Sequence, residues 1–182
     1  MDEAFRESPW PLYGLPESVP CRRYLAGWGR SGEVTTALEL GHLSPDGSLE
    51  KQLRIEVTPI TERRQEPEDY KRGLWRRAHL TGHAGEDLDA LRRRMEKVEQ
   101  DYETEAHITW ETVTITIDGE PRVCEQARLG DHWIALLEDG STSVVISGQD
   151  WPDHAPELVT VQDVEPYVQG SLRVWQEGFK RP

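Results

Sequence analysis

The feature that most constrains this chain is a series of four short β-type segments between residues 110 and 147. They read WETVTITI, RVCEQARL, HWIALLE and STSVVIS, and they are separated by Asp118-Gly119, Gly130-Asp131 and Asp139-Gly140. Gly and Asp tolerate the backbone angles of tight hairpin turns, so this spacing predicts an antiparallel meander. The WIALL segment is apolar on both faces, so we expect its strand to be central and covered on both sides.

Two amphipathic helices are expected to flank the meander. Residues 86–106 predict a long helix, because its apolar residues recur at intervals of three and four: Leu88, Leu91, Met95, Val98 and Tyr102. Asp163 is a suitable cap for a last helix with the same spacing. We expect the long helix to pack on a sheet, with a short coiled-coil dimer as the alternative.

The amino-terminal third predicts an arm followed by strands. Residues 1–20 contain four prolines, which favours an extended arm. VTTALELGHL and LEKQLRIEV flank the turn sequence SPDGS, so residues 21–60 predict a hairpin region. We therefore expect an α+β protein with one domain over 21–182, in which 21–60 and the helix–meander–helix of 86–182 are sub-units. The segment EDYKRGLWRRAHL is compatible with a further short helix.

Charge and composition restrict the compartment and the partners. The chain of 182 residues carries a net charge of -13, which opposes non-specific binding to nucleic acid. No apolar run has the length of a membrane span and the first residues lack an apolar core, so we expect a cytoplasmic protein without membrane association. In that compartment Cys21 and Cys124 are expected to be reduced. The chain has 17 Arg, 4 Lys and no Asn, which is typical of a GC-rich bacterial genome.

Residues 24–34, YLAGWGRSGEV, contain glycines at positions 27, 29 and 32. Dinucleotide-binding loops and the glycine-rich loop of kinases share this spacing. The β-branched run that follows predicts a strand, whereas a dinucleotide loop must lead into a helix. The kinase motifs HRD, DFG and VAIK are absent from the sequence. We therefore interpret this stretch as a glycine-rich hairpin or bulge connection that displays Trp28 and Arg30.

Histidines provide two further candidate sites. His79 and His83 are four residues apart, a spacing that can hold a metal on one helix face. Gly82 interrupts such a helix and no HExxH glutamate is present, so we predict a loop, no metal and no cofactor. His132 and His154 each neighbour an aspartate, which leaves an acid/base pair open as an alternative. The sequence identifies no catalytic residue.

The distribution of charge suggests an interaction surface. Residues 71–77 form a basic cluster, whereas 129–172 contain eight acidic residues and no Lys or Arg. The two regions either complement each other or leave the acidic half for a basic protein partner. The candidate interaction residues are Trp28, Arg30, Arg72, Trp75, Arg76, Asp139, Asp150, Trp151 and Asp153.

Three functions follow as hypotheses. The first is a small acidic, non-catalytic protein that binds another macromolecule in an immunity-like or regulatory role, with a homodimer left open. The alternative is an enzyme or small-ligand binder whose pocket lies between the helices and the antiparallel sheet. The third is nucleic-acid binding through the basic cluster, which the net charge opposes.

The carboxy-terminal half also carries a resemblance. Its DGEP turn, the tryptophan early in the next strand, the DG hairpin and the closing D-x-x-P-Y motif are similar to stretches of uncharacterised actinobacterial proteins. These are motifs of turns, core and helix cap. The resemblance therefore implies no activity.

Overall fold

The computed structural model describes residues 2–31, 34–48, 50–62, 65–80, 87–152 and 156–178. Its helices are α1 (Asp2–Arg6), α2 (Pro67–Leu80), α3 (Leu88–Glu105) and α4 (Glu165–Gly178), with a 3-10 turn η1 at Ile60–Glu62. Its strands are β1 (Tyr13–Gly14), β2 (Arg22–Ser31), β3 (Val34–Leu43), β4 (Gln52–Pro59), β5 (Glu111–Ile117), β6 (Glu120–Leu129), β7 (His132–Asp139), β8 (Thr142–Gln149) and β9 (Glu157–Thr160).

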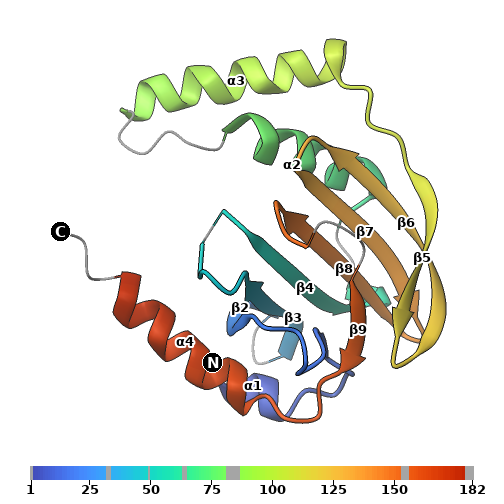
Figure 1. Cartoon of the computed structure of the whole chain (residues 1–182). Coiled ribbons are helices and arrows are strands. Elements are labelled where there is room, and N and C mark those ends of the chain that lie inside the picture. The colour runs from blue at the N-terminus through green and yellow to red at the C-terminus, as the bar shows by residue number, and fades with distance from the viewer. Residues whose placement is uncertain are drawn as a thin grey trace.

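These strands form one curled sheet in the order β1-β9-β5-β6-β7-β8-β4-β3-β2. Of the strand pairs described, only β5 with β9 is parallel. The predicted α+β class with an antiparallel sheet is confirmed. The pair α2 and α3 lies on one side of the sheet, and α1 and α4 lie on the other (Figure 1). None of the described helices has the length and apolarity needed to cross a membrane. Cys21 and Cys124 are both free thiols.

Strand β7, which contains the WIALL segment, lies at the centre of the sheet and is covered on both faces, as predicted. Trp133, Ala135 and Leu137 belong to the core on the α4 side of the sheet, which we call the inner core. Ile134 packs on the other face with Leu74 and Trp75 of α2, in what we call the outer cluster. The Trp133 indole occupies the space that a side chain at Gly148 would need, since a Cβ there would lie 2.2 Å from its nitrogen. Glycine at position 148 therefore leaves room for Trp133, the largest residue of β7.

Helix α3 packs on α2, where the sequence led us to expect a sheet. Val98 and Tyr102 are buried at this contact, but Leu88 is 82% exposed and Leu91 and Met95 are also exposed. Helix α2 already occupies the outer face over β6 and β7, so α3 forms an additional layer on top of α2. Only the carboxy-terminal half of its apolar stripe finds a partner within the described residues.

The glycine-rich stretch lies within β2, which pairs with β3. The pairing register shifts between Leu25 and Gly27 and again between Gly29 and Arg30. Such shifts are characteristic of β-bulges. This stretch was interpreted as a hairpin or bulge connection, whereas Gly27 and Gly29 lie inside β2, with the bulge-type register shifts beside them. Gly32 lies outside the described residues.

The amino-terminal segment joins the inner core through a buried histidine. Phe5, Leu12 and Tyr13 are buried there. The backbone N–H of Leu15 donates to Nε2 of His42 at 3.2 Å, and the Tyr167 hydroxyl lies 2.9 Å from the same nitrogen. Burial lowers the pKa of His42 to about 3, so the ring stays neutral and accepts this bond.

Helix α4 covers the outer edge of β2. The backbone N–H of Leu25 donates to Oγ of Ser171 at 2.6 Å, which gives an edge donor a partner. Gly170 packs directly on the backbone of Arg23, since a Cβ at this glycine would lie 1.6 Å from the Arg23 carbonyl oxygen. The helix can approach the edge this closely only because residue 170 has no side chain.

Two helical glycines give a matched test of this packing. Gly170→Ala should lower the free energy of unfolding by about 1–3 kcal/mol, because the methyl group forces α4 away from β2. Gly73→Ala should raise it by about 0.5–1 kcal/mol, because no atom lies within 4 Å of its Cβ position and alanine favours the helix. Denaturant unfolding measures both. Changes of the same sign in the two variants would contradict this packing.

Candidate functional site

The candidate site is a cleft of about 580 Å³ between α2 and the outer face of β3, β4, β7 and β8. Its floor is formed by strand residues, namely Glu39, Arg54, Glu56, Ile134, Val145 and Ser147. Its wall is formed by α2 and the residues before it, namely Gln65, Asp69, Tyr70, Arg72, Gly73, Arg76 and Arg77. Most of these side chains are polar or charged. The cleft is therefore a place where charged groups from two different elements converge.

The cleft exists because α2 covers only part of the outer face. Leu74 and Trp75 are buried and fix the helix over β6 and β7. The Trp75 indole N–H also donates to the Val98 carbonyl oxygen at 2.9 Å, which holds α3 on top of α2. The opposite flank of α2 overhangs β8, β4 and β3, and the space beneath that flank is the cleft.

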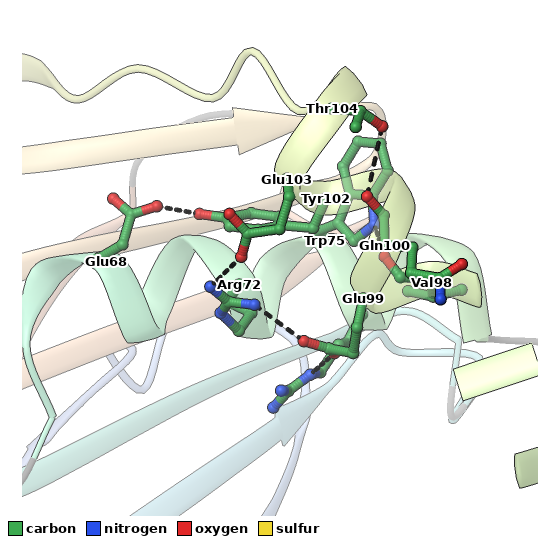
Figure 2. Close-up of polar contacts among 10 residues, drawn as sticks. Glu68, Arg72, Trp75, Val98, Glu99, Gln100, Tyr102, Glu103 and Thr104 are labelled. Carbon is green, nitrogen blue, oxygen red and sulfur yellow. Dashed lines mark hydrogen bonds and ion pairs between the residues drawn. The ribbon is translucent and has the colours of Figure 1, made fainter. Parts of the chain in front are cut away.

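Arg72 and Arg76 form ion pairs with α3, and Figure 2 shows those of Arg72. The Arg72 guanidinium lies 3.0 Å from Glu99 and 2.6 Å from Glu103. Arg76 also donates to Glu99. A hydrogen bond from Arg76, with a further one from Arg72, lowers the pKa of Glu99 and so favours its charged form. These arginines pair with α3, and none of their ion pairs described here involves residues 129–172.

The Tyr102 side chain adds a second link between the two helices (Figure 2). Its hydroxyl donates to Glu68, and its ring lies beneath the Arg72 guanidinium at 4.6 Å. Burial, followed by the bond to Glu68, raises the pKa of Tyr102, so the hydroxyl remains a donor. The wall of the cleft is thus held in place from its outer side.

The floor carries an ion pair next to a pair of like charges. Arg54 lies 3.6 Å from Glu39, and Glu39 is the direct cross-strand partner of Glu56. Burial raises the pKa of Glu39, while the charge of Arg54 acts in the opposite direction. Burial also raises the pKa of Glu56, and the hydrogen bond from Thr58 opposes that shift. Like charges directly opposite each other in a sheet are destabilising, so this arrangement weakens the free protein.

Three charged side chains of the cleft, namely Asp69, Arg77 and Glu56, form no ion pair with the described residues. Arg77 forms no ion pair or hydrogen bond with them, and burial followed by the nearby Arg54 charge lowers its pKa. Glu56 accepts one hydrogen bond, from the Thr58 hydroxyl at 3.3 Å. Arg77 is exposed and Glu56 is half-buried, and both lie at a concave surface, where water solvates charge less well than it does on an open surface.

Gly73 lies in the middle of α2 and lines the cleft. No atom lies within 4 Å of the position that its Cβ would occupy, so packing does not require a glycine there. Glycine in a helix interior is less favourable than alanine by about 1 kcal/mol. The absence of a side chain at this position keeps the wall of the cleft flat.

The residues predicted as an interaction surface are distributed over several elements. Arg72, Trp75 and Arg76 lie together on α2, but Trp75 is buried in the outer cluster. Trp28 lies on β2 and is 41% exposed. Arg30 falls on the same strand, with its side chain outside the described part.

Three of the remaining predicted residues, Asp139, Asp150 and Trp151, lie at or just after the ends of β7 and β8. Asp139 accepts a hydrogen bond from the Tyr13 hydroxyl. The Asp150 backbone N–H donates to the Asp131 carbonyl oxygen at 3.1 Å, and desolvation and the Asp131 charge raise the pKa of Asp150. Trp151 is half-buried against the inner core. Asp153 lies outside the described residues.

The sequence did not identify Glu39, Arg54 and Glu56 as site residues, and it placed Arg77 only in the basic cluster considered for nucleic-acid binding. Arg54 and Glu56 were interpreted only as the polar face of a half-buried strand. No local signal shows that this face lies beneath α2, because the cleft depends on a contact between elements that are distant in the sequence. A ligand pocket between the helices and the antiparallel sheet stays a prediction.

The histidine candidates contribute little to the site. His79 lies in the last turn of α2, so the predicted loop is wrong at this residue, and its ring stacks on Trp75 with ring centroids 4.0 Å apart. His83 lies outside the described residues. Burial lowers the pKa of His132, and His154 also lies outside the described part. Within the residues that are described, no group of three or more His, Cys, Asp or Glu side chains is arranged to hold a metal.

No protein-family model matches the chain, and neither the curated proteins nor the solved structures contain a significant match to it.

Glu56→Gln tests whether this half-buried carboxylate weakens the free protein. The pKa of Glu56 is raised in the fold, so the folded protein favours the protonated form of this side chain. The contribution of Glu56 to stability is therefore fully present below the ordinary glutamate value of 4.5, and it is lost as the pH rises through the folded pKa. We therefore expect the variant to be more stable than the wild type at neutral pH, and this gain should disappear below pH 4.5. Unfolding curves recorded across this range measure the difference.

The matched control is Glu96→Gln, which removes one carboxylate from the exposed face of α3. If Glu96→Gln showed the same gain, the effect would come from net charge. The environment of Glu56 would then not be its cause.

Proposed function

We propose that this protein binds a small polar ligand in the cleft beneath α2. The observation that supports this proposal most strongly is the unpaired Arg77 guanidinium, which lies in a concave space of about 580 Å³. Ligand sites are concave and contain a few polar groups that converge on the ligand. Charged groups whose pKa is shifted by burial are also concentrated at functional sites.

Gly73 supports the same proposal independently. A residue that is unfavourable in a helix and that no packing contact requires is consistent with a need for open space beside it.

A larger side chain at position 73, which would fill the cleft, provides the test. Compounds from a library of polar metabolites should raise the melting temperature of the wild type and of Gly73→Ala. They should fail to stabilise Gly73→Leu, whose side chain projects into the cleft. A thermal-shift screen measures this effect.

The circular dichroism spectrum of Gly73→Leu should match that of the wild type, which separates blocking from unfolding. The proposal would be wrong if no compound stabilises the wild type. It would also be wrong if the stabilising compounds act equally on Gly73→Leu.

A second candidate function is the binding of a protein partner, as the acidic composition led us to expect. The observation that favours it is the apolar stripe on α3, where Leu88, Leu91 and Met95 are exposed on one helix face. Contiguous exposed apolar residues often mark interaction surfaces. A partner helix that covers this stripe would extend the α2–α3 layer.

Co-purification from native lysate tests the second candidate. Wild-type protein should retain a stoichiometric protein partner, and Leu91→Glu together with Met95→Glu should release it. Glu96→Lys, on the exposed face of the same helix, should have little effect on retention. Recovery of the wild type as a free monomer alone would contradict this function.

A further inference from the structure

The charges of the cleft follow a simple order. The Arg54–Glu39 ion pair lies in the middle of the floor. Arg77 lies close enough to Arg54 and Glu39 for both charges to shift its pKa. Glu56 lies across the strand pair from Glu39, and no arginine is among the groups that shift its pKa. Arg77 therefore lies near both members of the ion pair, and Glu56 lies beside its carboxylate. Neither Arg77 nor Glu56 has an ion-pair partner among the described residues.

We propose that the ligand of this cleft is zwitterionic, with an acidic group bound by Arg77 and a basic group bound by Glu56. This inference rests on the proposed function and specifies the ligand class of the same site. It follows from charge complementarity, because the acidic end of such a ligand neutralises the Arg77 guanidinium and the basic end neutralises the Glu56 carboxylate.

Ligands with a single sign of charge fit less well. A dianion that reaches from Arg77 to Glu56 places a negative group beside a carboxylate that already faces Glu39. A dication places a positive group beside Arg77, which already faces the charge of Arg54. Unlike Arg77, the other arginines of the wall are paired with Glu99 and Glu103, so they contribute less to the binding of an anion.

A neutral apolar ligand is also a poor match. It would displace water from Arg77 and Glu56 without replacing the lost hydrogen bonds, and unsatisfied charged groups are strongly unfavourable. The cleft is large enough for an amino-acid derivative or a short peptide, because ligand sites of about 300–1,000 Å³ hold compounds of drug size.

Three linear probes of equal carbon number separate these classes. They are ε-aminocaproate, which is zwitterionic, adipate, which is a dianion, and hexamethylenediamine, which is a dication. Isothermal titration calorimetry at neutral pH and low salt measures the dissociation constant of each probe. We expect ε-aminocaproate to bind at least about tenfold more tightly than either of the others.

Two substitutions assign the ends of the ligand. Arg77→Gln should weaken ε-aminocaproate by about tenfold and should reduce its advantage over hexamethylenediamine. Glu56→Gln should weaken it by a similar factor and should reduce its advantage over adipate. Arg92→Gln and Glu96→Gln make the same changes in net charge on the exposed face of α3, and they should leave all three constants unchanged.

The inference would be overturned if adipate or hexamethylenediamine binds as tightly as ε-aminocaproate. It would also be overturned if Glu56→Gln or Arg77→Gln leaves these constants unchanged, or if none of the three probes binds. Compounds from the metabolite library that stabilise the wild type but not Gly73→Leu would still support the proposed function in each case. The failure of the ligand class is therefore distinguishable from the failure of the site.

Discussion

The packing of Leu74 and Trp75 on the outer face of the central strands determines the position of α2, and the candidate site depends on that position. A helix centred on β6 and β7 cannot also cover β8, β4 and β3, so its other flank overhangs an open part of the sheet. Helix α3 reinforces this placement from outside, through the bond from Trp75 to Val98 and the ion pairs of Arg72. The cleft is thus a direct result of how one short helix is anchored.

Several features of the cleft are unfavourable for the stability of the free protein. Two glutamates face each other across β3 and β4, Arg77 and Glu56 form no ion pair with described residues, and a glycine interrupts the middle of α2. Elsewhere the packing is close, as in the contact of Gly170 with the Arg23 backbone. Natural proteins tolerate such local losses at sites where binding requires them. The concentration of these features in one concave place is the main reason to regard it as functional.

The parts of the fold that depend on local pattern could be predicted from the sequence. Turn dipeptides and alternating strands indicated the meander, and the two-sided WIALL segment indicated the central strand. The site itself could not be predicted, because Glu39, Arg54 and Arg77 come from three elements that only tertiary packing brings together. The basic cluster was visible, but its pairing with Glu99 and Glu103 requires the contact between α2 and α3. Long-range contacts of this kind leave no periodic signal in the chain.

The most direct test of the central claim is to locate the bound ligand by chemical-shift mapping. Titration of isotope-labelled protein with ε-aminocaproate should shift the backbone amide signals on both sides of the cleft, namely Gly73 on α2 together with Arg54 and Ser147 on the floor. The signals of α4 and of the exposed half of α3 should not move. A titration that shifts only signals away from the cleft, or shifts none, would contradict the account.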